Sequence, residues 1–385
     1  AVCLDFLQEG RDVLCEKPLA TNAADAEMMV EASRKSEARL AVNLIRRRFP
    51  AYRTAKRFLE RGLLRVESVR GEDGYVFNWP ASAYFLDRTK AGGGVLLDWG
   101  SHTIDMLHYL FDGDLELLSS QDDGLGGVEA NCRVLLKIRT TNNEIQCDLR
   151  LSRTRTLQNN LVIHGGKSSL EVRNSEPNRA YLQIDGQTHV MERLGPTKND
   201  IVDLFLDQVV AFLDKSSNDY VDGAEALESL QFIETCYGKR KSIVYPWEID
   251  AKPRVSYSFP SRDIKILVVG ASGFLGTRLV ERLFVDLNVK ARAALHRTET
   301  AARVARVPVE FVNCDLLQPE QVMRAVDRCD VVVNCARERS GEKKRVLDVS
   351  VRGTSNLLEA ASRKNVKKFI HISTAAVHGF ASKEG

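Results

Sequence analysis

The sequence has 385 residues, 44% hydrophobic and 28% charged, a composition typical of folded globular proteins and unlike that of disordered or fibrous ones. Its 55 basic and 52 acidic residues leave a net charge of +3, which argues against nucleic-acid partners. The eight cysteines form no C-x-x-C pair, and no apolar run reaches the roughly 18 residues that span a bilayer. We therefore expect a cytoplasmic protein of two or three domains, without a membrane partner or a metal site.

The first 45 residues alternate between helical and strand patterns. Residues 1–10 have helical periodicity that ends at Gly10, and RDVLCEKPLA predicts a short strand that runs into Glu16, Lys17 and Pro18. A second helical segment and the strand RLAVNLI follow. This β-α-β order indicates a parallel sheet covered by helices. Because the chain opens inside a helix, we expect the N-terminal part of this domain to be missing.

Residues 92–105, GGGVLLDWGSHTID, place three glycines directly before a helix with one polar face. On a single helix Asp98, His102, Asp105 and Tyr109 recur at spacings of four, three and four, with apolar residues opposite. The glycines should lie where the backbone turns tightly or approaches another segment closely. The polar stripe is either a solvated helix face or a site built around a titratable histidine.

From about residue 65 the pattern changes to alternating strands with hairpin-like turns, which predicts an antiparallel sheet in an α+β domain. GGKS at 165–168 lacks the spacing of a phosphate-binding loop and is interpreted as a turn. Two amphipathic helices close this part near residue 245. Residues 246–262 contain three prolines and no helical period, and 249–262 is predicted to be an interdomain linker.

A new domain is predicted to begin with IKILVVGASGFLGTRLVERL at 264–283, an apolar strand, a glycine-rich turn and an amphipathic helix. The G-x-x-G-x-x-G spacing lets the backbone pass close to a pyrophosphate held at the helix N-terminus. Strand and helix stand on the correct sides of the turn, so the sequence predicts dinucleotide binding here. The turn residues assigned to this site are Gly270, Ser272, Gly273, Phe274, Leu275 and Gly276.

The next strand, VKARAALHR, indicates which dinucleotide this domain binds. It ends in Arg297 without an acidic residue to bind a ribose 2′-hydroxyl, and Arg292 lies nearby. This favours NADP over NAD. The alternative is that both arginines line a solvated strand end.

CEKPLA and AGGGVLLDWGSHTID together resemble motifs of the Gfo/Idh/MocA oxidoreductases, over about residues 1–248. The resemblance implies a truncated Rossmann domain at 1–45 and an α+β substrate and oligomerisation domain at 46–248, forming a homo-oligomer through its antiparallel sheet. It also implies a catalytic site beside the nicotinamide of NAD or NADP. The residues carried over are Lys17, Asp98 and His102, with Glu16 and Pro18 shaping the cofactor-side turn.

These three side chains suit the oxidation of a secondary alcohol. His102 can accept the hydroxyl proton, and Lys17 can stabilise the developing alkoxide. Asp98 can orient the imidazole or bind a neighbouring hydroxyl.

Residues 263–385 resemble the epimerase and dehydratase branch of the extended short-chain dehydrogenase/reductases, through VGASGFLG, CDLLQPEQV, VVVNCA and KKFIHISTAAVHG. The resemblance implies a second Rossmann-type, doubly wound parallel sheet. It places Asp315 and Leu316 on the adenine side, Asn334 and Ala336 along the cofactor, and Thr374 as the catalytic hydroxyl residue.

This part of the chain also departs from that family's pattern. His378 replaces a usual tyrosine, Ser350 stands where asparagine is common, and no Tyr-x-x-x-Lys follows Thr374. The second domain is therefore expected to be incomplete at its C-terminus, and its substrate stays open.

Together the two resemblances predict part of a bifunctional NAD(P)-dependent oxidoreductase that acts on sugars, polyols or nucleotide sugars. Because each domain lacks an element of its site, we expect the chain itself to be inactive. The alternative is a non-catalytic cofactor sensor or scaffold that retains the nucleotide-binding folds.

Overall fold

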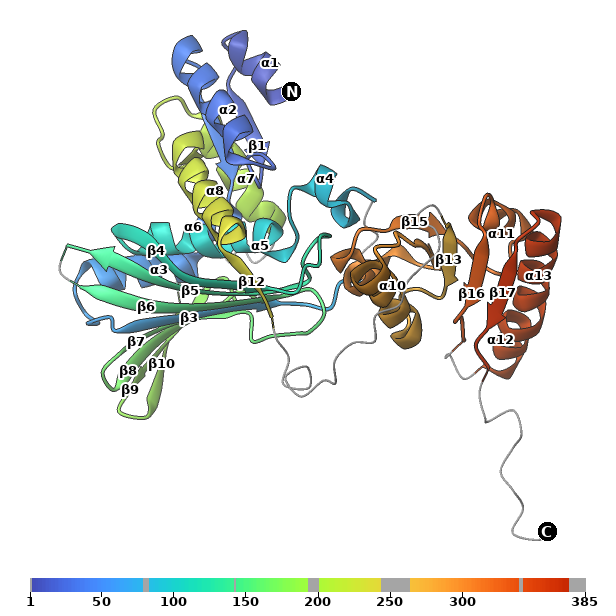
Figure 1. Cartoon of the computed structure of the whole chain (residues 1–385). Coiled ribbons are helices and arrows are strands. Elements are labelled where there is room, and N and C mark those ends of the chain that lie inside the picture. Colours follow the sequence, from blue (N-terminus) through green and yellow to red (C-terminus); the bar gives the residue numbers. More distant parts are fainter. Residues whose placement is uncertain are drawn as a thin grey trace. The chain divides into compact units, whose positions relative to one another are not determined.

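The computed structural model describes residues 2–78, 83–141, 143–192, 201–243, 264–338 and 342–373 (Figure 1). The chain divides into two compact units. The first comprises residues 1–76, 88–123 and 129–243, and the second comprises 77–87, 124–128 and 244–385. The predicted linker at 249–262 lies outside the described residues, and the predicted domain boundaries remain predictions.

The first unit begins with a small three-stranded sheet. Strands β1 (Val13–Glu16) and β2 (Leu40–Asn43) pair in parallel, and β11 (Val221–Asp222) pairs antiparallel with β2. Helices α1 (Val2–Gln8) and α2 (Ala23–Ser36) accompany the parallel pair. The predicted β-α-β alternation is therefore confirmed, and the Glu16–Pro18 turn lies at the carboxyl end of β1.

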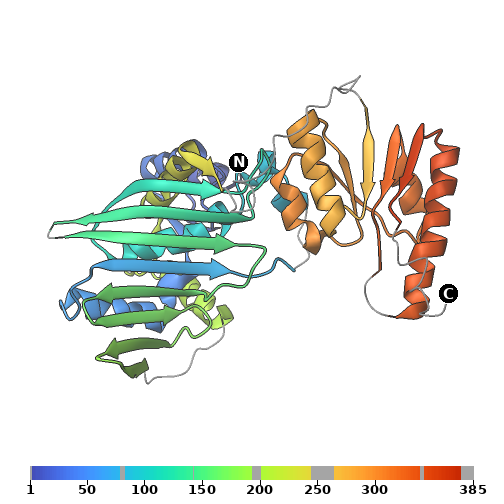
Figure 2. The ribbon, with the colours of Figure 1, turned by 60° about the horizontal axis from the view of Figure 1, so that its bottom comes forward.

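A nine-stranded sheet forms most of the first unit (Figure 2). Its order is β10-β9-β8-β7-β3-β6-β5-β4-β12. The strands are β3 (Ser68–Gly74), β4 (Gly113–Asp122), β5 (Asn131–Thr140), β6 (Glu144–Ser152), β7 (Asn160–Gly165), β8 (Ser168–Arg173), β9 (Arg179–Ile184), β10 (Gln187–Glu192) and β12 (Arg240–Ser242).

This sheet is mixed, whereas the sequence predicted an antiparallel one. β3 pairs in parallel with β6, and β12 pairs in parallel with β4, because intervening helices carry the chain across the sheet before it returns. The GGKS segment is the turn between β7 and β8, as expected, since Gly165 pairs with Ser168 across the hairpin.

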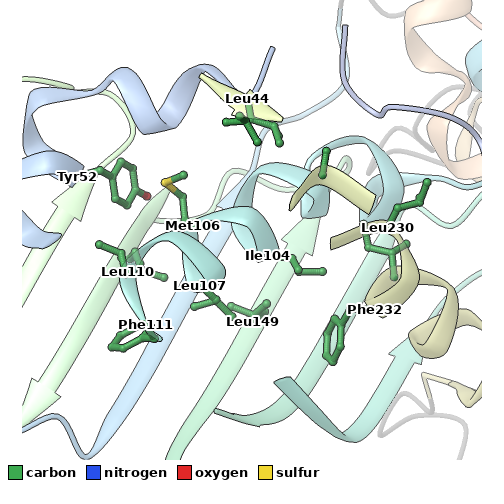
Figure 3. Packing of buried hydrophobic residues seen from close by; sticks show 14 of the residues in the cluster. Leu44, Tyr52, Ile104, Met106, Leu107, Leu110, Phe111, Leu149, Leu230 and Phe232 are labelled. Atoms are coloured by element: carbon green, nitrogen blue, oxygen red, sulfur yellow. The ribbon is translucent and has the colours of Figure 1, made fainter. Parts of the chain in front are cut away.

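Helices pack on one face of the nine-stranded sheet and enclose the core of this unit. Figure 3 shows Ile104, Leu107 and Leu110 of one helix against Leu149 of β6, with Phe232 of another helix beside them. The helical segments are η1 (Ile45–Arg48), α3 (Pro50–Glu60), α4 (Arg88–Ala91), α5 (Val95–Asp98), α6 (Gly100–Leu110), α7 (Ile201–Leu213) and α8 (Gly223–Gly238).

The second unit contains a five-stranded parallel sheet in the order β15-β14-β13-β16-β17. The strands are β13 (Ile266–Val269), β14 (Arg292–Leu295), β15 (Glu310–Asn313), β16 (Val331–Asn334) and β17 (Lys368–His371). The order reverses at β13 and β16, which is the doubly wound arrangement that the sequence predicted.

Helices cover both faces of this second sheet (Figure 2). α10 and η3 contact each other on one face, and α11 and α13 contact each other on the opposite face. The helical segments are η2 (Ala83–Leu86), α10 (Phe274–Leu287), η3 (Thr298–Arg306), α11 (Pro319–Val326), α12 (Lys343–Leu347), η4 (Asp348–Gly353) and α13 (Thr354–Arg363).

The described part of the chain has neither a membrane-spanning helix nor a metal-binding cluster. Every helix there is too short or too polar to cross a bilayer. The same residues contain no group of three or more histidine, cysteine, aspartate or glutamate side chains that could hold a metal ion.

Candidate functional site

The three glycines at 92–94 lie where only glycine fits. Added Cβ atoms would lie 2.4 Å from the carbonyl oxygen of Thr21, 2.1 Å from the Tyr237 hydroxyl and 2.0 Å from the carbonyl oxygen of Glu129. The first glycine also has a φ of +75°. The sequence predicted a close approach at this turn, and the structure shows it at each of the three positions.

Glu129 anchors the start of α5. Its fully buried carboxylate accepts the backbone N–H of Gly94 at 2.9 Å and of Leu96 at 3.0 Å, and the Tyr237 hydroxyl at 2.8 Å. Burial raises the pKa of Glu129, although these donors oppose the rise. The carboxylate satisfies N–H groups that a helix start would otherwise leave unpaired.

The predicted single helix is broken at Trp99 into α5 and α6. The cause lies in the carbonyl oxygen of Asp98, which accepts Lys17 Nζ at 2.8 Å and Ser101 Oγ at 2.9 Å. The backbone N–H of His102 donates instead to Trp99, at 3.1 Å. Asp98 and His102 therefore start from two different helices.

The polar stripe is also not a solvated face. Asp105 is fully buried, and its carboxylate lies 2.7 Å from Nη2 of Arg47. Burial raises the pKa of Asp105 to about 6, and the guanidinium of Arg47 limits that rise. This part of the predicted stripe belongs to the interior of the unit.

Asp98 carries two cations, one on each carboxylate oxygen. Lys17 Nζ lies 2.6 Å from Oδ1, and Arg153 Nη2 lies 2.9 Å from Oδ2. Burial by itself would raise the pKa of Asp98, but the charges of Lys17 and Arg153 outweigh it and lower the pKa below 3.8. The structure thus brings Lys17 to Asp98 across 81 positions of sequence, as the family motifs implied.

His102 is enclosed beside these charges. Burial lowers its pKa well below 6.5, and the positive charges of Arg46 and Lys17 lower it further. The imidazole is therefore neutral at pH 7. Within the described part of the chain its Nδ1 atom is buried without a hydrogen-bond partner.

Glu16 and Pro18 shape the turn that presents Lys17. The Glu16 carboxylate accepts Asn43 Nδ2 at 2.6 Å, and the Lys17–Pro18 peptide bond is cis. The turn is thereby tied to the end of β2.

Sequence reasoning missed several residues of this site. Arg46 forms a buried ion pair with Asp73 and lies 3.4 Å from Thr103 Oγ1. Tyr75 is 43% exposed, and its ring meets that of Trp99 edge-on with centroids 5.6 Å apart. Arg153 directly follows β6, and a charged residue at the end of a predicted strand is the sequence feature that could have indicated its role.

The glycine turn of the second unit fits a dinucleotide. Gly270 has a φ of +73°, and a Cβ atom on it would lie 2.8 Å from the backbone of Ala336. A Cβ atom on Gly276 would lie 2.2 Å from the carbonyl oxygen of Gly270. Gly273 caps α10, and Asn334 Oδ1 accepts the N–H of Ala336 at 3.0 Å, so the ends of β13 and β16 meet at this turn.

The other predicted cofactor residues surround the same end of the sheet. Phe274 and Leu275, 79% and 55% exposed, open α10. Thr300 Oγ1 lies 2.9 Å from Ser272 Oγ and donates to the carbonyl oxygen of Arg297 at 2.9 Å. The glycine turn and the end of β14 are thereby linked.

The adenine-side residues and the neighbouring arginine have mainly structural contacts. Asp315 Oδ1 accepts the N–H of Leu317 at 3.0 Å, and Leu316 is buried. Arg292 pairs with Glu310 at 2.9 Å, which ties it to the neighbouring strand. Two further positions named from the family pattern, Thr374 and His378, lie outside the described residues.

Comparisons with known protein families give matches in both the first and the last part of the chain. Residues 1–44 match the model of an oxidoreductase family with an NAD-binding Rossmann fold, and 52–171 match the GFO/IDH/MocA C-terminal domain. Residues 266–384 match the NAD dependent epimerase/dehydratase family.

Curated relatives are similar to parts of the chain. Trans-1,2-dihydrobenzene-1,2-diol dehydrogenase of Xenopus tropicalis is 32% identical over 115 residues, 29% of this chain and 34% of the relative. The 1,5-anhydro-D-fructose reductase of Ensifer adhaerens is 29% identical over 174 residues, 44% of this chain and 52% of the relative. The chain thus spans between a third and about half of these relatives.

A solved structure shares the fold. The aldose-aldose oxidoreductase from Caulobacter crescentus, complexed with glycerol, has a TM-score of 0.54 and 22% identity, covering 62% of this chain and 72% of that one. With the matched segments, the first part of the chain is similar to the Gfo/Idh/MocA oxidoreductases, and residues 266–384 are similar to the NAD dependent epimerase/dehydratase family.

Proposed function

We propose that the first unit is the substrate-binding part of an NAD(P)-dependent oxidoreductase that interconverts a secondary alcohol of a sugar or polyol and the corresponding ketone. The observation that carries the proposal is the pairing of Lys17 with Asp98 beside the half-buried, neutral His102. A cation beside a proton acceptor supports the proposal, because alcohol oxidation requires both groups.

Lys17 is positioned to hold a substrate oxygen. An ammonium group has three N–H donors, and among the described residues two of them reach Asp98, one to Oδ1 and one to the carbonyl oxygen. The third can donate to the hydroxyl oxygen of the substrate and stabilise it as negative charge develops.

His102 can accept the hydroxyl proton because its imidazole is neutral near pH 7. Once protonated, the ring would stand beside the charges of Lys17 and Arg46. The same charges favour return of the proton, so the group can also serve as the acid in ketone reduction.

When bound, the nicotinamide supplies or accepts the hydride. In the second unit the backbone at Gly270–Gly276 would hold the dinucleotide phosphates, and Arg297 would favour NADP. For the first unit the proposal covers NAD or NADP, approached by the Glu16–Pro18 turn at the end of β1.

Sugars and polyols are the proposed substrates for two reasons. The Ensifer relative and the Caulobacter structure are named for an anhydrofructose and for aldoses. In addition, the exposed ring of Tyr75 meets Trp99, which directly follows Asp98. Aromatic faces pack well against the apolar C–H faces of sugar rings.

The proposal for the whole protein is a bifunctional enzyme. Its second unit would carry an epimerase, dehydratase or reductase activity on a nucleotide sugar, with Thr374 as a hydroxyl group at the reacting carbon. A cytoplasmic location and a homo-oligomer formed through the nine-stranded sheet are part of the same proposal. The competing function is a cofactor sensor that binds dinucleotide without turnover.

The experiment uses the full chain with a panel of polyols, sugars and nucleotide sugars. Binding is followed by calorimetry and turnover by nicotinamide absorbance, for the unchanged chain and for Lys17→Met. Arg11→Met on the surface of the same unit is the matched control. The enzyme is supported if polyol binding or turnover is lost in Lys17→Met and kept in Arg11→Met. The sensor is supported if the chain binds dinucleotide and Lys17→Met does not change its behaviour toward polyols.

A further inference from the structure

We infer that Arg153 is a positioning residue of the candidate catalytic site, which acts through Asp98 to hold Lys17 in place. The inference rests on the proposed function of that site. Lys17 Nζ and Arg153 Nη2 bind different oxygens of the Asp98 carboxylate, at 2.6 and 2.9 Å. Neither cation can take over both oxygens while the other is present.

This arrangement changes the role expected for Asp98. With both carboxylate oxygens held by cations, Asp98 serves as a counter-ion rather than as the partner that orients His102. The unpartnered Nδ1 of His102, among the described residues, agrees with that role. Asp98 therefore sets the position of Lys17, and Arg153 sets the position of Asp98.

Arg153 is itself held firmly. Its side chain is 4% exposed, and its backbone N–H donates to the carbonyl oxygen of Ala130 at 2.7 Å. It follows β6, whose last residue, Ser152, accepts the N–H of Tyr75 at 3.1 Å.

The charges at the site favour a substrate that becomes negative. Lys17, Arg153 and Arg46 contribute three positive charges, against the two carboxylates of Asp98 and Asp73, which leaves one net positive charge. An alkoxide forming at Lys17 would balance it. Removing Arg153 would remove this excess and free Oδ2 of Asp98 to turn toward Lys17.

The test compares Arg153→Met and Arg153→Lys, with turnover measured in the complete enzyme. Arg133→Met is the matched control, because Arg133 on β5 of the same sheet also pairs with an aspartate at 2.9 Å but is 44% exposed. We expect Arg153→Met to lower kcat by roughly 10- to 100-fold with KM within about threefold, as a misplaced Lys17 predicts. Arg153→Lys should restore most of the loss, and Arg133→Met should change neither constant.

A second readout does not need turnover. The Asp98 carboxylate is titrated by ¹³C NMR with labelled aspartate, and Asp98→Asn identifies its signal. Loss of one of two cations should raise the pKa of Asp98 in Arg153→Met, but not in Arg153→Lys or Arg133→Met.

The two readouts separate the inference from the proposed function. An unchanged Asp98 titration in folded Arg153→Met would overturn the inference, as would wild-type kcat in that variant. Absence of polyol binding to the unchanged chain would overturn the proposed function, while the titration still reports on Arg153.

Discussion

Lys17 and Asp98 are joined twice, through the carboxylate at 2.6 Å and through the main-chain carbonyl oxygen at 2.8 Å. The second contact occupies the carbonyl oxygen that would accept the His102 N–H in a continuous helix, whereas that N–H donates to Trp99. The position of Lys17 and the helix break at Trp99 therefore involve the same carbonyl oxygen, that of Asp98. A substitution at Lys17 should alter local helix geometry as well as charge.

Replacing His102 by alanine should lower turnover in the complete enzyme by roughly 10²- to 10⁴-fold, the range for loss of a general base. In the proposed mechanism the residue would contact substrate rather than phosphates, so dinucleotide affinity should stay within a few-fold. Stopped-flow hydride transfer and cofactor titration measure the two effects. His164→Ala, on the exposed part of β7, is the control, and unchanged turnover in His102→Ala would return the imidazole to a structural role.

Gly94→Ala should destabilise the first unit by more than about 3 kcal/mol, because its Cβ atom would lie 2.0 Å from backbone that cannot rotate away. Thermal unfolding of the full chain measures the effect as a lower Tm. Gly238→Ala is the matched control, since a Cβ atom there meets nothing within 4 Å and the residue ends α8. Equal Tm values for the two variants would contradict the steric account of the glycine turn.

The sequence predicted the local features of this fold better than the non-local ones. The β-α-β alternation and the glycine turns have short-range signals, namely hydrophobic period and residues that suit special backbone geometry. The parallel pairing of β3 with β6 has no such signal, because it depends on where the chain returns after its helices. The predicted antiparallel pairing is therefore confirmed except between β3 and β6 and between β12 and β4.

The residues of the candidate site also fall into those that the sequence indicated and those that it did not. Lys17, Asp98 and His102 stand in recognisable motifs, whereas Glu129, Tyr237 and Arg153 are joined to those motifs only by folding. Tyr237 lies 108 positions from Glu129, and Arg153 lies 55 positions from Asp98. The single-helix prediction failed because a lysine from another element captures the carbonyl oxygen of Asp98.

Asp105 predicts a pH dependence of stability. Its pKa is raised from 3.8 to about 6 in the folded chain, so the folded state binds the proton more tightly than the unfolded state. Stability from this group is full below pH 4 and is lost as the pH rises from about 4 to about 6, by roughly 2–3 kcal/mol.

Urea unfolding of the first unit at pH 4 and pH 7 tests whether the stability contributed by Asp105 falls as the pH rises. Carboxylates with lowered pKa values, such as Asp98, act in the opposite direction, so the comparison is between the unchanged chain and Asp105→Asn. The amide keeps a hydrogen bond to Arg47 but cannot ionise. The variant should gain stability relative to the unchanged chain as the pH rises, and a constant difference between the two would count against the prediction.

Arg297 should select the dinucleotide of the second unit, because a guanidinium binds a 2′-phosphate with two hydrogen bonds and finds no such group on NAD. Arg292 pairs with Glu310, whereas Arg297 precedes η3 and its carbonyl oxygen is linked through Thr300 to Ser272 of the glycine turn. Arg297→Ala should weaken NADP binding by about tenfold or more, since charge-assisted hydrogen bonds contribute about 1.5–3 kcal/mol, and should leave NAD affinity nearly unchanged. Calorimetric titration of the full chain with both dinucleotides measures the difference, with the highly exposed Arg328→Ala as control. Tighter binding of NAD than NADP by the unchanged chain would refute the assignment, because no 2′-phosphate would then be recognised.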